Sequence, residues 1–294
     1  MKYIPEPKTM VAIKDLSLAA KMTLDNFMAG LNRSRVKGEG TEFSQYRQYM
    51  SGDDLRNLDW KVLARTGRHY IKQSEPEQNI AVHLMLDASA SMKHDCGSYQ
   101  KIDYARYLAA CLALLAYRQG DKIGLSFFNE TEIKRIMPQQ HAQQLQIIYQ
   151  SLSALQANGR FENREGFKWL LGAKQKELMV FITDFYEHDD EIMRLIKLFV
   201  ALGHEVVMLH LMAANELDGS FKSYDALEDA ETGEIVVLGS ISPEKHKQLV
   251  ESYLSRSRQT LLENKVHYCM VNANDPPEKA LREFLIYRNS LTRR

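Results

Sequence analysis

Several absences narrow the function of this chain before any motif is considered. Its 294 residues carry no net charge, with 38 basic and 38 acidic side chains, which argues against a partner chosen by bulk charge, such as nucleic acid or acidic lipid. Its three cysteines form no CxxC pair, which excludes a cysteine-based zinc site. No apolar run approaches the roughly 18–20 residues that span a bilayer, and the first residues lack the apolar core of a secretory signal. We therefore expect a cytoplasmic protein with no membrane span.

Short apolar runs alternate with longer helical patterns through the middle of the chain. The runs have the length and texture of strands buried on both faces of a parallel sheet, at residues 80–86, 122–128, 178–183 and 206–211. The patterns between them predict helices at 102–117, 142–155, 164–171 and 191–202. Together they predict a doubly wound, mostly parallel α/β domain over residues 78–212, with an antiparallel edge strand at 131–137.

Two further regions flank this domain. Residues 1–77 hold a predicted helix at 15–29, ended by Gly30, followed by charged sequence with little periodicity. Residues 213–294 predict an acidic hairpin that turns into 235–238, a helix from Pro243, a last strand at 266–271 and a terminal helix. We expect this third region to pack on the α/β domain.

The neutral total hides a segregation of charge between the flanks. Residues 30–72 carry nine basic and five acidic side chains, whereas residues 213–234 carry seven acidic and one basic side chain. Opposed patches of this kind orient a protein partner during encounter.

Carboxylates follow two of the predicted strands at the point where each strand ends. Asp87, Ser89 and Ser91 form a DxSxS turn after the first buried strand, and Asp184 ends the strand at 178–183. Because ligands bind beyond the carboxyl ends of parallel strands, we expect these side chains to share one rim of the sheet. Their hard oxygen donors suit Mg²⁺ or Mn²⁺.

A second unusual stretch, residues 38–67, interleaves acidic, basic and glycine residues around one tryptophan. The residues with an expected structural or partner-binding role are Arg47, Gly52, Asp53, Asp54, Arg56, Asp59, Trp60 and Arg65. Gly38 and Gly40 are not a dinucleotide fingerprint, because no buried strand precedes them. Two interpretations stay open: an internal ion-pair network with Trp60 as its packing anchor, or a surface that recognises a partner.

The DxSxS turn and Asp184 resemble the metal-ion-dependent adhesion site of von Willebrand factor A-like domains. In that family a threonine before the third helix completes the site, but residues 157–163 contain neither threonine nor serine. Arg160 lies there, and its guanidinium is a candidate substitute for the cation. The resemblance implies that Asp87, Ser89, Ser91 and Asp184 hold the metal, directly or through water, and that the metal accepts an acidic side chain of the partner.

A longer resemblance is carried by GEGTEFSQYRQYMSGDDLRNLDWKVLARTGRHYIKQSEPE and the preceding GLNRSRVKG. This segment is similar to the hallmark sequence of the domain of unknown function 58 family, the MoxR-associated von Willebrand A-like proteins. The resemblance spans residues 15–290. It implies a bacterial, cytoplasmic module with a Rossmann-like α/β fold. It also implies partnership with a MoxR-type AAA+ ATPase in assembly or maturation of other proteins, without catalytic activity.

The sequence lacks residues that the enzymatic interpretations require. A phosphotransferase of the haloacid dehalogenase type needs a second aspartate where Ser89 stands, and a serine hydrolase needs glycines where Ala88 and Ala90 stand. His83 and His210 fall inside apolar strands, so we expect core histidines with satisfied hydrogen bonds. We therefore expect a non-enzymatic protein-interaction module. The alternatives are a metal-independent scaffold whose rim loops bind a partner and, less favoured, a metal-dependent hydrolase.

Overall fold

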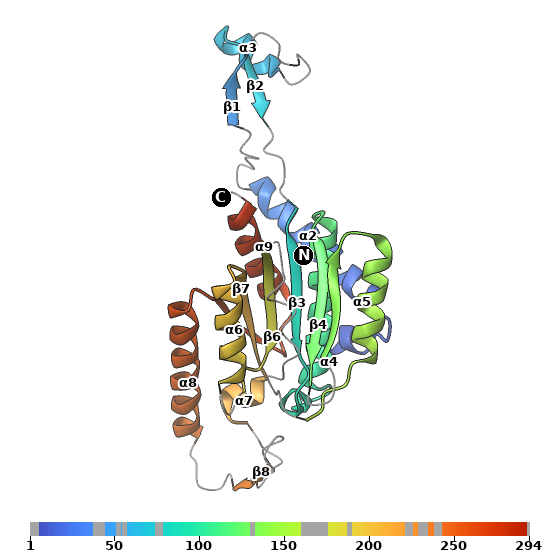
Figure 1. Cartoon of the computed structure of the whole chain (residues 1–294), viewed down its shortest axis with the longest axis vertical. Helices are drawn as coiled ribbons and strands as arrows, with labels where there is room; N and C mark the ends of the chain where they lie inside the picture. Colours follow the sequence, from blue (N-terminus) through green and yellow to red (C-terminus); the bar gives the residue numbers. More distant parts are fainter. Residues whose placement is uncertain are drawn as a thin grey trace. The chain divides into compact units, whose positions relative to one another are not determined.

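Two compact units make up the chain in its computed structural model (Figure 1). Residues 1–27 and 79–294 form the α/β unit, and residues 28–78 form a second unit, here called the hallmark unit. The residues that the structure describes are 6–37, 45–50, 54, 58–73, 79–129, 133–159, 176–186, 190–220, 226–228, 235–237 and 243–292. The first 27 residues, expected in the N-terminal region, thus belong to the same compact unit as the α/β elements.

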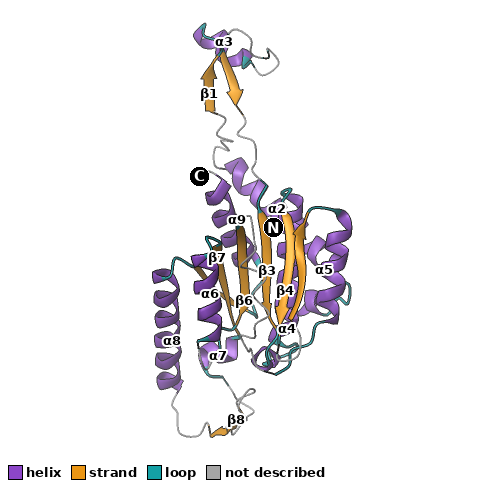
Figure 2. Ribbon diagram, in the orientation of Figure 1, coloured by secondary structure: helices purple, strands orange, loops and turns teal. Residues whose placement is uncertain are grey.

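A six-stranded sheet forms the centre of the α/β unit (Figure 2). Its strands are β3 (Ala81–Asp87), β4 (Lys122–Phe128), β5 (Ile133–Gln139), β6 (Glu177–Thr183), β7 (Glu205–Met212) and β10 (His267–Asn272). They lie in the order β10-β7-β6-β3-β4-β5, and every pairing is parallel except that of β4 with β5. The predicted doubly wound sheet with one antiparallel edge strand is confirmed.

The chain leaves the middle of this sheet in two directions. β3 leads through α4 (Lys101–Arg118) to β4, whereas β6 leads through α6 (Glu191–Ala201) to β7. Since such crossovers are right-handed, α4 and α6 cover opposite faces. The buried side chains of Met85 and Phe181 accordingly pack in one cluster with those of α6. The reversal between β3 and β6 is the switch point, where open α/β sheets bind ligands.

The remaining elements of the α/β unit complete its layers. They are α1 (Pro7–Val11), α2 (Leu16–Lys37), η2 (Ala90–Lys93), α5 (Ala142–Ala154), α7 (Ala214–Asp218), the β8–β9 hairpin (Ala226–Glu228 and Ile235–Val237), α8 (Pro243–Glu263) and α9 (Glu278–Thr292). The expected acidic hairpin, the helix from Pro243, the last strand and the terminal helix are all present. The helix expected at 164–171 lies outside the described residues.

One predicted helix end is wrong. Gly30 was expected to end the N-terminal helix, but α2 continues through it to Lys37 and therefore passes from the α/β unit into the hallmark unit. A glycine inside a helix costs only about 1 kcal/mol relative to alanine, so the longer helix tolerates it. No helix in the described ranges is long and apolar enough to cross a membrane.

The hallmark unit contains a small antiparallel ladder and a short helix. β1 (Gln45–Gln48) pairs with β2 (Tyr70–Gln73), and Leu58 forms a bridge to Ile71 on the other side of β2. Helix α3 (Trp60–Thr66) begins where the side chain of Asp59 accepts hydrogen bonds from two backbone N–H groups, and it ends at Gly67 in the left-handed conformation. These residues form a defined substructure in which Leu58 and Ile71 are buried.

Candidate functional site

The DxSxS turn begins at a fully buried carboxylate. Asp87 ends β3, and its Oδ1 accepts a hydrogen bond from the backbone N–H of Ser89 at 2.9 Å, which bends the chain sharply. Its Oδ2 accepts a hydrogen bond from Thr183 Oγ1 on β6 at 2.6 Å. Asp87 thus connects the two strands on either side of the switch point.

The loop after α5 holds this turn from a third side. The backbone N–H of Asn158 donates to the carbonyl of Ala88 at 2.8 Å, and the N–H of Ala90 donates to the carbonyl of Gly159 at 2.7 Å. The turn is therefore fixed by hydrogen bonds from the neighbouring loop as well as by its own aspartate. Arg160, the candidate cation substitute, lies outside the described residues.

A chain of side-chain hydrogen bonds joins the turn to Asp184. Ser91 Oγ donates to Asp184 Oδ1 at 3.1 Å, and the hydroxyls of Ser89 and Ser91 are 2.9 Å apart. Because Ser91 donates its proton to Asp184, its oxygen accepts from Ser89. Asp87, Ser89, Ser91 and Asp184 thus lie together on one rim, as the sequence led us to expect. That they bind a metal stays a prediction.

The structure adds a residue that sequence reasoning missed, Lys101 at the start of α4. Its Nζ lies 3.1 Å from Asp184 Oδ2 and 2.8 Å from Oε1 of Glu216, and its side chain is only 1% exposed. Glu216 belongs to α7 and its Oε2 accepts a hydrogen bond from the backbone N–H of Ala213 at 2.6 Å, which fixes its orientation. A buried ammonium therefore bridges the strand-ending aspartate and helix α7, which follows β7.

Electrostatics separate the roles of the buried groups. Burial, followed by the charge of Asp184, raises the pKa of Asp87 to about 6, although the hydrogen bonds from Thr183 and Ser89 oppose the rise. Burial alone would lower the pKa of Lys101, but the carboxylates of Asp184 and Glu216 outweigh it and raise that pKa above its ordinary value. Lys101 is therefore a permanent cation at neutral pH.

The residues of the 38–67 stretch fall into four groups. Asp59 caps α3, and Asp54, Trp60 and Arg65 are exposed, with Trp60 at 62%. Arg47 lies on β1, where only its backbone is described. Gly52, Asp53 and Arg56 lie outside the described residues. Because its indole faces solvent, Trp60 does not anchor a core within the described part of the hallmark unit.

His83 lies between a serine and a glutamate, as the histidine of a hydrolytic triad does, yet it is a core residue. Its Nε2 lies 2.8 Å from Ser126 Oγ and its Nδ1 lies 3.1 Å from Glu177 Oε2, an order of groups found in hydrolytic triads. Ser126 and His83 are fully buried in adjacent strands and Glu177 is 9% exposed, so no substrate reaches the serine. The expectation of a satisfied core histidine is confirmed for His83.

His210 departs from that expectation at one nitrogen. Its Nδ1 lies 3.0 Å from the Tyr268 hydroxyl, but its buried Nε2 has no hydrogen-bond partner among the described residues. The rings of Phe185, Tyr253 and Tyr268 surround it at centroid distances of 5.8–5.9 Å. Burial in this aromatic cage lowers the pKa of His210 to about 4.

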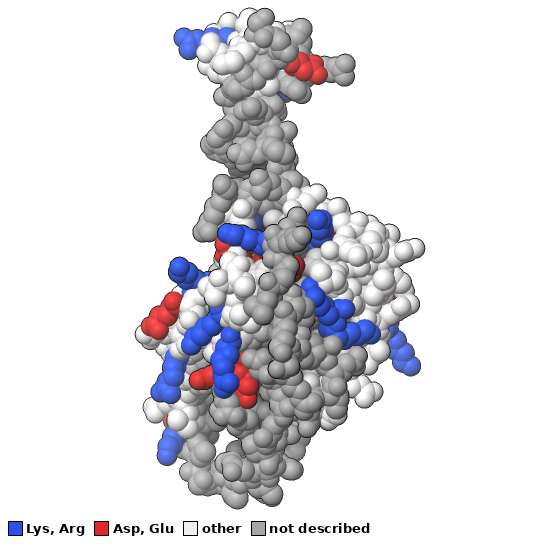
Figure 3. All heavy atoms as spheres, in the orientation of Figure 1, with Lys and Arg blue, Asp and Glu red and all other residues white. Residues whose placement is uncertain are grey.

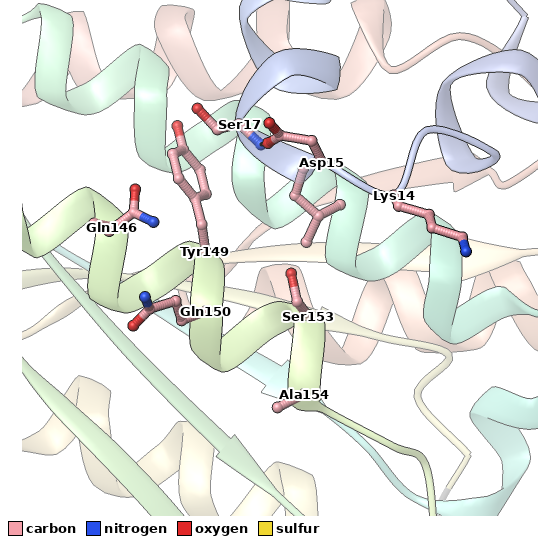
Figure 4. A pocket seen from close by; sticks show the side chains of 9 residues that line it. Lys14, Asp15, Ser17, Gln146, Tyr149, Gln150, Ser153 and Ala154 are labelled. Atoms are coloured by element: carbon pink, nitrogen blue, oxygen red, sulfur yellow. Dashed lines mark hydrogen bonds between the residues drawn. The ribbon is translucent and has the colours of Figure 1, made fainter.

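A surface hollow of about 630 Å³ lies between residues 14–17, at the start of α2, and α5 (Figure 4). Its lining is polar, with Lys14, Asp15, Ser17, Gln146 and Gln150 around the buried Tyr149. None of its lining residues belongs to the Asp87–Lys101 network, and no cluster of three or more His, Cys, Asp or Glu side chains suited to a metal occurs among the described residues. This hollow is therefore separate from the Asp87–Lys101 network.

The strand order, the DxSxS turn at the switch point and the adjoining Asp184 define a von Willebrand A-like α/β protein. The chain belongs to the family described as "Protein of unknown function DUF58", whose model matches residues 45–259.

Relatives and solved structures are similar over most of the chain. The uncharacterized proteins Mb1516 of Mycobacterium bovis and Rv1480 of Mycobacterium tuberculosis are each 26% identical over 243 residues, which cover 82% of this chain and 76% of the relative. The conserved hypothetical protein BatB from Bacteroides thetaiotaomicron is similar with a TM-score of 0.45 and 16% identity, over 72% of this chain and 100% of that one. The SpRpn10 VWA domain has a TM-score of 0.39 and 10% identity, over 70% of this chain and 94% of that one.

Proposed function

We propose that this protein is a non-enzymatic protein-interaction module that binds a MoxR-type AAA+ ATPase and acts with it in assembly or maturation of other proteins. The family resemblance of the 38–67 stretch supports the choice of partner. The exposed tryptophan of the hallmark unit carries the proposal of a binding surface.

This surface lies at one end of the β1–β2 ladder. The N–H of Tyr49 donates to the carbonyl of His69, and the N–H of Asp59 donates to the carbonyl of Tyr70, the first residue of β2. Met50 and Trp60 are the next residues in the chain after Tyr49 and Asp59, so both lie near the start of β2. Met50 is 65% exposed and Trp60 is 62% exposed. Single exposed apolar residues are ordinary, but two large ones at the same end of a ladder form the kind of anchor found at interfaces.

Basic side chains accompany the two apolar ones (Figure 3 colours Lys and Arg blue). Lys61, Arg65 and Arg68 are all exposed on or just after α3, and Lys61 and Arg65 are one helical turn apart. We call Met50, Trp60, Lys61, Arg65 and Arg68 the tip. Tryptophan and arginine are the residues most enriched at binding hot spots, so the tip suits an apolar pocket on the partner with an acidic border.

Co-purification of the full chain with a MoxR-type ATPase of the same organism tests the proposal. Truncating a hot-spot tryptophan costs at least about 2 kcal/mol, so Trp60→Ala should weaken the complex roughly 30-fold or more. Ile286→Ala is the matched control, because Ile286 is a similarly exposed apolar residue at 57% on α9 of the other unit. Equal recovery of the ATPase with both variants would overturn the tip as its binding surface.

The metal-bridged version of the same function is a second candidate. It rests on the hydrogen-bonded gathering of Asp87, Ser89, Ser91 and Asp184 on the rim, with Mg²⁺ or Mn²⁺ as the bridging ion. EDTA and Asp87→Ala would each abolish the complex if this version held. Hydrolysis of general phosphate or ester substrates that Asp87→Ala removes would overturn both candidates, because each is non-enzymatic.

A further inference from the structure

The rim site has the acidic residues of a cation site, but its oxygens already have partners. Both oxygens of Asp87 accept hydrogen bonds, from Ser89 N–H and from Thr183 Oγ1. Asp184 Oδ1 accepts from Ser91 Oγ, and its Oδ2 accepts from the Lys101 ammonium. A divalent ion would have to share these oxygens with their hydrogen-bond donors and would lie beside the Lys101 ammonium, so the described arrangement disfavours one.

We propose that the ammonium of Lys101 is the resident cation of this site and takes the place of a divalent metal. Two carboxylates from different elements, Asp184 after β6 and Glu216 on α7, contact Nζ at 3.1 and 2.8 Å. Lys101 is 1% exposed, and a lysine is buried to this extent only when paired charges compensate its lost hydration. The lysine therefore performs the charge neutralisation that a bound ion performs elsewhere.

The position of the ammonium leaves no room for both cations. A metal on Asp184 Oδ2 would lie about 2.1 Å from that oxygen, and hence at most roughly 5 Å from Nζ, which is 3.1 Å from the same oxygen. Two positive charges at that distance in a buried site repel each other strongly. Binding of a divalent ion would require Lys101 to leave its two partners.

This inference deepens the proposed interaction function and rests on it for one consequence. A metal at the rim would offer an open coordination position to an acidic side chain of the partner. Lys101 is buried and already paired with Asp184 and Glu216, so it offers no such position. The complex with the ATPase is therefore indifferent to EDTA.

Two measurements on the full chain test the proposal. Isothermal titration of the wild-type protein with Mg²⁺ and with Mn²⁺ should give no heat of binding. Lys101→Met removes the charge but keeps most of the side-chain volume, so it should lower the melting temperature in metal-free buffer. Added Mn²⁺ should then raise that temperature by about 4 °C when it is present at about 100 times its dissociation constant.

Arg288→Met is the matched control, because Arg288 forms another described ion pair in which both side chains are nearly fully buried, with Asp121. It should destabilise the protein without any recovery in Mn²⁺. If Lys101→Met folds under neither condition, the double variant Lys101→Met/Glu216→Gln carries one fewer uncompensated charge and is assessed in the same way.

Heat of binding in the wild-type protein would overturn the proposal. A Lys101→Met protein, or its double variant, whose melting temperature does not change when Mn²⁺ is added would also overturn the proposal. Neither result affects the binding comparison with Trp60→Ala, so failure of this inference and failure of the proposed function are distinguishable.

Discussion

The ion pair between Arg288 and Asp121 gives the sharpest stability prediction. Arg288 of α9 donates from Nε to Asp121 Oδ2 at 2.8 Å and from one terminal nitrogen to Oδ1 at 2.7 Å, a two-pronged contact. The two side chains are 4% and 0% exposed. Arg288→Met would leave a buried carboxylate whose remaining described hydrogen bond is from the N–H of Ile80. Breaking such a pair costs about 3–5 kcal/mol.

An exposed arginine–aspartate pair provides a reference for this cost in stability. Arg118 and Asp25 are 2.7 Å apart, but their side chains are 37% and 53% exposed. Water and salt screen such pairs, which typically contribute about 0.2–1 kcal/mol. Arg118→Met should therefore cost several times less than Arg288→Met, although the two contacts are equally short.

Urea unfolding followed by circular dichroism measures both losses as shifts of the midpoint at constant slope. The double variant Arg288→Met/Asp121→Asn should recover part of the loss, because it removes the unpaired charge that the single change leaves behind. Equal costs for the buried and the exposed arginine would refute the reasoning that burial decides the value of an ion pair here.

Three further predictions concern other parts of the fold. Burial lowers the pKa of His210 from 6.5 to about 4, so between these pH values the unfolded chain binds a proton at His210 that the folded chain does not bind. The stability of the wild-type protein relative to His210→Phe should therefore fall by roughly 3 kcal/mol as the pH drops through this window, a comparison in which the opposite contribution of Asp87 cancels. Asp59→Ala should cost about 1 kcal/mol by removing the cap of α3, seen as faster proteolysis of the hallmark unit, and Asp59→Ser should preserve resistance. Gly124→Ala should lower the melting temperature at a cost of about 1–3 kcal/mol, since its Cβ would lie 2.8 Å from both Ile136 O and Pro138 Cγ.

Each of these has an outcome that would contradict it. A pH profile unchanged by His210→Phe would show that another group governs the acid limb. Equal proteolysis of the alanine and serine variants at Asp59 would show that its side-chain cap does not hold α3. An unaffected Gly124→Ala protein would show that β5 moves away from β4 without cost.

The sheet and the rim carboxylates were predictable for physical reasons. Strands buried on both faces of a parallel sheet are continuous apolar runs, and helical spacing between them implies crossovers, so the topology follows from the alternation. Asp87 and Asp184 could be placed together because both end such strands and parallel strands end at the same edge.

Lys101 and Trp60 were harder to assign. Lys101 starts α4, where the helix dipole disfavours a cation, and that anomaly was the available signal of a special role. Its partner Glu216 is 115 residues away in the sequence, so no local pattern pairs them. Trp60 stands among charges that suit either an ion-pair network or a binding surface, and only its exposure in the folded unit separates the two.

The central claim is that this family member binds its ATPase partner through the tip and without a bridging metal. The most direct test is the dissociation constant of that complex for the wild-type protein with and without EDTA, and for Trp60→Ala. We predict a constant that EDTA leaves unchanged and that Trp60→Ala raises roughly 30-fold or more. A complex that EDTA abolishes and that Trp60→Ala leaves intact would contradict the account.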